Sequence, residues 1–304
     1  MQVSLVLGSG GARGYAHVGV IEELLRRGHE IVSISGASMG ALIGGLYCAD
    51  AMDEFVAFAR SLGRAEVMKY IDPALNEPGL IKAKRVTTLL SKMVGDVQIE
   101  DLPIPFSAVA TDIVNRREVW FRKGSLVAAI RASIAIPTVF TPVMINNRLL
   151  ADGGVLNPLP VEPGVHPDTE LIVGVSLIGR DPKLLITPRE ENPLTKHEPH
   201  WGDKIAEDLK ESSWGRKLVD LIPGSKEPKE FQAIPDEIGI TEMLTMALDA
   251  MQGAIQQTRI AANPPDVLIE IPTNSCGVLD FHCADQMIEM GRELADNCFD
   301  SIGL

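Results

Sequence analysis

Cysteine is scarce in this 304-residue sequence. The few that occur are far apart, show no C-x-x-C spacing and do not belong to a small secreted scaffold that disulfides would need to stabilise. They are Cys48, Cys276, Cys283 and Cys298. We therefore expect reduced thiols, as in a cytoplasmic protein.

Long apolar runs are also missing. No stretch approaches the roughly 18 residues of a membrane span, and Met1–Leu5 lacks the basic start and apolar core of a signal peptide. These absences predict a cytoplasmic protein that is at most peripheral to a membrane.

Positive charge is in deficit, because the formal net charge is −13. Such a chain repels nucleic acid phosphates, so we expect no nucleic acid partner. Any contact with lipid must be apolar or confined to a local basic patch. The hydrophobic fraction of 45% and the charged fraction of 23% are those of an ordinary globular protein.

The stretch Ile31–Cys48 organises the rest of the chain. Its first residues alternate as in a buried strand, its last residues have helical spacing, and Gly36-Ala37-Ser38-Met39-Gly40 joins the two. Gly-x-Ser-x-Gly between a strand and a helix is the pattern of a nucleophile elbow, in which Gly36 and Gly40 permit a tight turn. Ser38 is thus a candidate nucleophile; the alternative is a glycine-rich connection without function.

A second glycine-rich turn, Gly8–Gly14, follows a short apolar strand and precedes a helix from about Tyr15. Arg13 occupies the position of the third glycine in a dinucleotide fingerprint, and no Gly-Lys-Ser/Thr follows as in a P-loop. The amides near Gly10, Gly11 and Ala12 could form an oxyanion hole, with Arg13 orienting the loop. A nucleotide or phosphate site and a plain turn remain as alternatives.

A third motif places Asp152 at the end of a predicted strand, with Gly153 and Gly154 behind it. Such an aspartate can hold its carboxylate at a rim where another group approaches. Asp-Gly is also a common turn pair, so this stretch alone favours a turn.

Together, three spaced motifs resemble the patatin-like phospholipase family: Gly10–Gly14, Gly36–Gly40, and Asp152–Gly154 followed by Asn157–Pro160. Sequence segments outside these motifs also resemble bacterial members of that family, namely Ala110–Asp112, Arg131–Pro137 and Leu279–Phe281. The similarity runs from Val3 to about Asp300.

The resemblance implies an α/β fold with three α/β/α layers and a mainly parallel central sheet, in a single domain over residues 1–304. It further implies a Ser38–Asp152 dyad, an oxyanion hole from Gly10–Arg13, no metal, no organic cofactor, and hydrolysis of acyl esters in phospholipids or related lipids. A triad in which one of His166, His197, His200 or His282 supplies the base is the alternative mechanism. The alternative function is a non-catalytic ligand-binding or regulatory module that holds a nucleotide or phosphate at Gly8–Gly14.

The sequence also leads to structural expectations for three further segments. The polar stretch 181–235 is expected to be an insertion or lid. Ile81–Met93 is the most basic stretch and reads as a solvated helix or a contact with anionic head groups. In Ile240–Ile260, Met243, Leu244 and Met251 belong to an apolar stripe that predicts a buried helix face. The sequence does not indicate the oligomeric state.

Overall fold

The computed structural model describes residues 1–64, 67, 84–137, 139–179 and 240–304. Within these ranges, residues 1–179 and 244–304 belong to one compact unit. The predicted insertion or lid at 181–235 lies outside the described residues, and the single-domain assignment stays a prediction.

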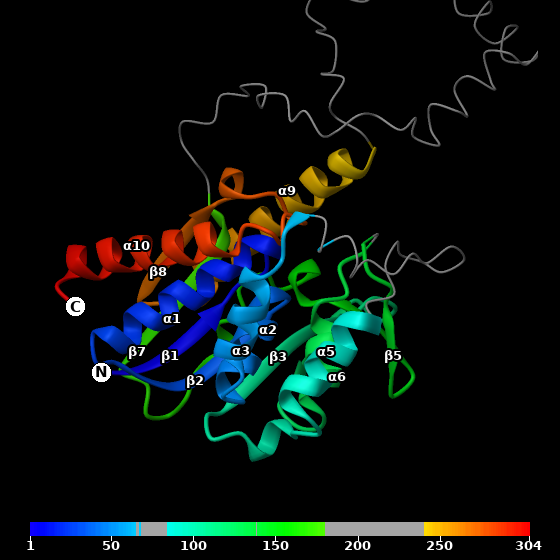
Figure 1. Ribbon diagram of the computed structural model, residues 1–304, viewed down its shortest axis with the longest axis horizontal. Helices are drawn as coiled ribbons and strands as arrows, with labels where there is room; N and C mark the ends of the chain where they lie inside the picture. Colours follow the sequence, from blue (N-terminus) through cyan, green and yellow to red (C-terminus); the bar gives the residue numbers. More distant parts are fainter. Residues whose placement is uncertain (65–66, 68–83, 138, 180–239) are drawn as a thin grey trace, which may run out of the picture. The chain divides into compact units, whose positions relative to one another are not determined.

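A mixed eight-stranded sheet forms the centre of this unit, in the order β5-β6-β3-β2-β1-β7-β8, with β4 paired to β3 (Figure 1). The strands are β1 (Gln2–Leu7), β2 (Glu30–Ala37), β3 (Phe106–Asp112), β4 (Arg117–Phe121), β5 (Val143–Ile145), β6 (Arg148–Asp152), β7 (Leu171–Gly179) and β8 (Val267–Pro272). From β3 through β2, β1 and β7 to β8 the pairing is parallel, whereas β4, β5 and β6 pair antiparallel.

Helices cover both faces of the sheet (Figure 1). They are α1 (Ala16–Arg26), α2 (Met39–Cys48), α3 (Met52–Arg60), α5 (Lys84–Val94), α6 (Leu126–Ser133), α9 (Ile240–Ala262) and α10 (Ala284–Ile302), with a 3-10 helix, η1 (Gly11–Tyr15), before α1. The predicted three-layer α/β/α fold is confirmed.

Strand β1 shows why two layers form, because its side chains alternate between the faces. Leu5 and its odd-numbered neighbours pack into the main core with α1, α2 and α10. Val6 faces the other way, against Leu159 and against Ile260 of α9. The strand is therefore buried on both sides, as expected for a central parallel strand.

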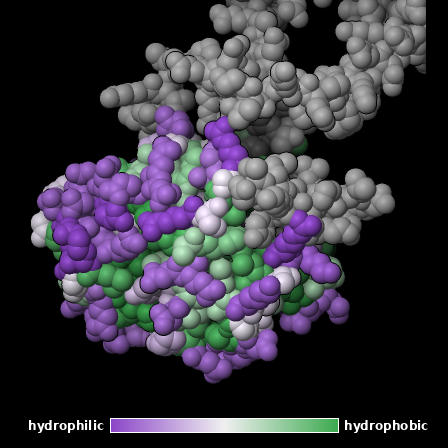
Figure 2. All heavy atoms as spheres, viewed as in Figure 1, coloured by the Kyte–Doolittle hydropathy of each residue, from purple (hydrophilic) through white to green (hydrophobic). Residues whose placement is uncertain are grey.

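Helix α10 is amphipathic. Its buried side includes Met287, Ile288 and Phe299, whereas polar side chains gather over it at the left of Figure 2. Among the described helices, none is both long enough and apolar enough to cross a bilayer.

Helix α9 contradicts the prediction of a buried apolar stripe. Met243, Leu244 and Met251 are exposed by 48%, 44% and 54%. The polar side chain of Gln256 is buried instead and exchanges hydrogen bonds with Ser176 of β7. The helix thus packs on the protein through a mixed face, which includes the polar Gln256 and the apolar Ile260. Sequence periodicity cannot reveal such a face when both sides of a helix contain mixed side chains.

Strand β3 brings two distant strands end to end. Ala108 and Val109 pair with both β2 and β4, and the next residues, Ala110–Asp112, pair with both β6 and β4. Because a strand has two edges, β2 and β6 must share the same edge of β3. β2 runs parallel to β3 and β6 antiparallel, so their carboxyl ends meet, with Ala37 opposite Val109 and Asp152 opposite Ala110.

Candidate active site

Ser38 lies at the sharp turn between β2 and α2. Its backbone has φ 56° and ψ −122°, a strained conformation for a residue with a side chain. Gly36 and Gly40 make the turn possible: a Cβ on Gly40 would lie 2.0 Å from the carbonyl oxygen of Leu7, and one on Gly36 2.4 Å from the carbonyl carbon of Gly40. The predicted strand, turn and helix are all present.

Ser133 supports this turn from the end of α6. Its hydroxyl accepts a hydrogen bond from the Ser38 amide at 2.8 Å and donates one to the carbonyl oxygen of Val109 at 2.6 Å. All these groups are buried. The strained residue is thereby tied to β3, the strand on which Asp152 is also aligned.

Asp152 ends β6 with its carboxyl group buried beside Ser38. Its Oδ1 accepts a hydrogen bond from the Gly154 amide at 2.7 Å, whereas Oδ2 has no partner in full hydrogen-bond geometry among the residues that the structure describes. Gly153 allows the chain to turn here, since a Cβ would lie 2.1 Å from the carbonyl oxygen of Val109. A Cβ on Gly154 would collide with the hydroxyl of Ser9 at 2.3 Å.

Burial raises the pKa of Asp152 from 3.8 to about 7, although hydrogen bonding from the Ser38 hydroxyl and from the Gly154 amide lowers it. Ser38 is the side chain whose hydrogen bond lowers the pKa of this carboxyl group. An acid with such a pKa exists in both protonation states near neutral pH, which suits a group that takes up and returns a proton.

The loop Gly8–Gly14 lies beside Ser38 and is shaped by its glycines. Gly11 has φ +60°, and a Cβ there would meet the carbonyl oxygen of Val278 at 2.3 Å. The amide of Ala12 donates to that same oxygen at 2.9 Å. The Ala12 amide is therefore already engaged, which disfavours it as an oxyanion donor.

Other amides of the loop are available. No backbone partner for the N–H of Gly10 or Gly11 is found in the described ranges, whereas a 3-10 helix uses its later amides internally. This pattern disfavours Arg13 as an amide donor and leaves Gly10 and Gly11 as the donors that the geometry supports.

Arg13 has a different part in the loop, consistent with the predicted orienting role. Its side chain is 1% exposed, its Nε donates to the carbonyl oxygen of Gly10 at 3.0 Å, and its Nη2 lies 3.2 Å from Oδ2 of Asp249 on α9. A buried cation needs such a counter-ion. Asp249 is thus the acidic partner that holds Arg13 against the loop.

The histidines in the described ranges lie apart from the Ser38–Asp152 geometry. His17 is buried, its Nε2 lies 2.9 Å from the Gly8 carbonyl oxygen, and burial lowers its pKa to about 4. His282 contacts Arg64, and His166 borders a cavity with Phe106 at the start of β3. Among the described histidines none is hydrogen-bonded to Ser38 or Asp152; His197 and His200 lie outside the described residues.

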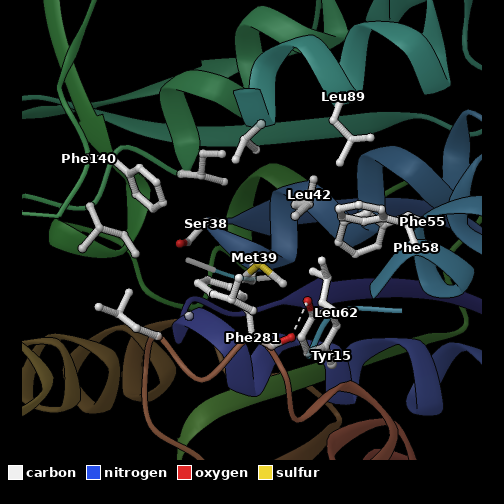
Figure 3. Close-up of a pocket in the computed structure, with 16 residues that line it drawn as sticks. Tyr15, Ser38, Met39, Leu42, Phe55, Phe58, Leu62, Leu89, Phe140 and Phe281 are labelled. Carbon is white, nitrogen blue, oxygen red and sulfur yellow. Dashed lines mark hydrogen bonds between the residues drawn. The ribbon is translucent and has the colours of Figure 1, made fainter. Parts of the chain in front are cut away.

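An apolar pocket of about 140 Å³ opens beside Ser38 (Figure 3). Figure 3 shows the Ser38 hydroxyl among hydrophobic side chains from α2, α3, α5 and the loop after α6. They include Met39, Leu42, Phe55, Phe58, Leu89 and Phe140. Gly11 and Ser38 both line the pocket, so an apolar chain there would place an attached polar group between the serine and the glycine loop.

Two residues of the site were not predicted from the sequence. Ser133 lies within Arg131–Pro137, a segment that resembles the family in sequence, but the sequence assigned no role to this serine. Asp249 lies 236 residues from Arg13, and a single acidic residue on a helix carries no signal of its partner.

The comparisons with known proteins agree with this architecture. The family model described as "Patatin-like phospholipase" matches residues 5–165. The chain therefore belongs to the patatin-like phospholipase family, a family of lipid hydrolases.

Within that family, similar relatives carry the NTE name. An "Uncharacterized NTE family protein" of Mycobacterium tuberculosis (strain H37Rv) is 36% identical over 99% of this chain and 92% of its own length. "Lysophospholipase NTE1" of Candida albicans is 27% identical over 98% of this chain, which spans 20% of that protein. VipD from Legionella pneumophila matches with a TM-score of 0.48 and 14% identity, over 99% of this chain and 66% of that one.

Proposed function

We propose that the protein hydrolyses acyl esters of phospholipids or lysophospholipids through a Ser38–Asp152 dyad. The observation that carries the proposal is that β2 and β6 meet end to end on β3, with Ala37 opposite Val109 and Asp152 opposite Ala110. Ser38, which follows Ala37, lines an apolar pocket. Membership of the patatin-like phospholipase family and the name of the Candida relative support the choice of substrate.

In the first half-reaction, Oδ2 of Asp152 takes the proton of the Ser38 hydroxyl as its oxygen attacks the ester carbonyl carbon. The amides of Gly10 and Gly11 would stabilise the negative oxygen of the tetrahedral intermediate, each by about 3 kcal/mol. When the carbon–oxygen bond to the alcohol breaks, Asp152 returns the proton to the departing alkoxide. The product is an acyl-Ser38 ester.

Water completes the cycle in the second half-reaction. Asp152 removes a proton from water, and the resulting oxygen nucleophile attacks the acyl-serine. Collapse of the second intermediate releases the fatty acid, and Ser38 regains its proton from Asp152. No other reactant is consumed.

The proposal is tested by labelling with a fluorophosphonate probe, which reacts with an activated serine. We expect the unaltered protein to be labelled, Ser38→Ala to be unlabelled, and Ser301→Ala, at an exposed serine of α10, to label normally. Labelling that survives Ser38→Ala would refute the assignment of the nucleophile. A panel of phospholipids and lysophospholipids then defines the head group and acyl position that are cleaved.

A further inference from the structure

Two turns lie side by side beyond the candidate active site. The β3–β4 turn follows Asp112, the β5–β6 turn contains Asn146 and Asn147, and the Ile113 amide donates to the carbonyl oxygen of Leu149 at 3.1 Å. Both turns extend past the carboxyl end of β3. At about 3.3 Å per residue, the tip at Val114 is roughly 15 Å beyond Val109, the level of Ser38.

These turns expose aliphatic side chains where polar residues are usual. Val114 is 69% exposed, Met144 63% and Ile113 40%. Single exposed apolar residues are ordinary, but Ile113 and Val114 in one turn and Met144 on the adjoining strand β5 form a cluster whose exposure to water is unfavourable.

The same turns also concentrate positive charge. Arg116, Arg117 and Arg148 are exposed, and the acidic group between them is the buried Asp112. Hydrogen bonds from Asn115, and then the charges of Arg117 and Arg148, lower the pKa of Asp112. Two of the arginines thus flank one carboxylate, and the local balance is positive in a chain whose net charge is −13.

We propose that these six residues, the hairpin patch, dock the protein on a bilayer that contains anionic lipids. The patch consists of Ile113, Val114, Arg116, Arg117, Met144 and Arg148. Its aliphatic side chains enter the boundary between head groups and acyl chains, and its arginines pair with lipid phosphates.

Docking at the hairpin patch would deliver lipid to Ser38, an inference that rests on the proposed function. Phe140 lines the acyl pocket and precedes β5, on which Met144 lies, by only a few residues. A lipid that leaves the bilayer at the patch therefore has a short path to Ser38. The net negative charge elsewhere on the chain would orient this edge toward an anionic surface.

Docking is tested by sedimentation with vesicles in the Ser38→Ala background, so that lipid is not consumed. We expect binding to vesicles of phosphatidylcholine mixed with phosphatidylglycerol, weaker binding to phosphatidylcholine alone, and loss with rising salt. Replacing Arg116, Arg117 and Arg148 together by glutamine should weaken binding about 100-fold, at about fivefold for each arginine. Val114→Asp should weaken it independently, at an exposed tip where folding is not at risk.

A matched control uses the opposite end of strand β3. Val165 is 53% exposed and borders the cavity at the start of β3, and Lys123 follows the far end of β4; Val165→Asp with Lys123→Gln should bind vesicles normally. Equal binding by patch and control variants, or binding that ignores anionic lipid, would overturn the proposal, as would a complete lack of vesicle binding.

Turnover of p-nitrophenyl butyrate separates this proposal from the proposed function. The hairpin-patch variants should hydrolyse this soluble ester normally while losing activity on vesicles. If the unaltered protein hydrolysed no ester, the proposed function would fail. The docking proposal would still be tested by the vesicle sedimentation assay, which does not depend on hydrolysis.

Discussion

Arg13 and Asp249 form an ion pair of 3.2 Å between the glycine loop and helix α9. The arginine is buried and also donates to the carbonyl oxygen of Gly10, whereas the aspartate is partly exposed. The orientation of a loop amide thus depends on a helix more than two hundred residues away in the sequence.

Replacing Asp249 should therefore impair turnover without removing any reacting group. In Asp249→Asn, Arg13 loses its counter-ion and the loop loses its fixed position. We expect kcat for a soluble ester to fall on the order of tenfold with little change in KM, because small displacements of stabilising groups act on the transition state. Steady-state kinetics with p-nitrophenyl butyrate measures the split.

The control for this variant lies on the same helix. Arg259→Gln removes the ion pairs of Arg259 with Glu118 and Glu162 but leaves Arg13 in place, so kcat should stay unchanged. Asp249→Glu keeps the charge and should recover part of the lost activity. Equal losses in Asp249→Asn and Arg259→Gln would indicate a general effect on α9 and contradict the positioning role.

The pH dependence of hydrolysis should report Asp152. The carboxylate must be ionised to accept the Ser38 proton, and its pKa is raised to about 7. We expect kcat/KM to rise tenfold per pH unit below that pKa and to level off above it. A profile that is flat between pH 5 and 8 would exclude Asp152 as the base.

The same raised pKa predicts that Asp152→Asn stabilises the folded protein at alkaline pH. The folded state binds the proton more tightly than the unfolded chain, so the stability that this group contributes is complete below pH 3.8 and is lost as the pH rises through 7. The shift corresponds to about 4 kcal/mol at most. Urea unfolding at pH 8 should show a gain of this sign in the variant, with hydrolysis suppressed; an equally active or less stable variant would contradict the assignment.

Ser133→Ala should weaken both the fold and the site. It leaves the Ser38 amide and the Val109 carbonyl oxygen buried without their partner, which costs about 1–3 kcal/mol. Thermal unfolding should shift down, and the rate of fluorophosphonate labelling should fall because the turn at Ser38 is less restrained. Ser125→Ala removes the N-cap of the same helix and should lower stability without changing the labelling rate of the folded protein.

Val86→Trp should shorten the acyl chains that the pocket accepts. Val86 lines the pocket from α5, so a larger side chain there removes volume that a long acyl chain needs and a short one does not. We expect kcat/KM for p-nitrophenyl octanoate to fall by about tenfold or more relative to the acetate ester. Thr88→Trp, at an exposed position of the same helix, should leave the ratio unchanged.

Local pattern was sufficient to predict the elements around Ser38. Strand β2 and helix α2 match the expected strand and helix, and Ser125 caps α6 locally, its hydroxyl accepting from the Ala128 amide at 3.3 Å. These features depend on residues within one or two turns of each other, so the sequence carries them directly.

The features that sequence reasoning missed all depend on contacts between distant segments. Ala12 loses its free amide to Val278, and α9 turns Gln256 rather than its methionines toward the sheet. Asp249 acquires its role only from the buried Arg13. A side chain's neighbours across the fold decide each of these outcomes, and no local spacing encodes them.

Strand β3 aligns the two strands that carry the candidate catalytic residues. Because Ala37, the residue before Ser38, and Asp152 are aligned on consecutive residues of β3, the separation of these two backbone positions is set by the strand and not by the length of a loop. The connections on either side can change in length or composition while this spacing stays constant. One residue inserted into β3 between these two pairings would offset them by a further step of about 3.3 Å and reverse the faces of the strand beyond it.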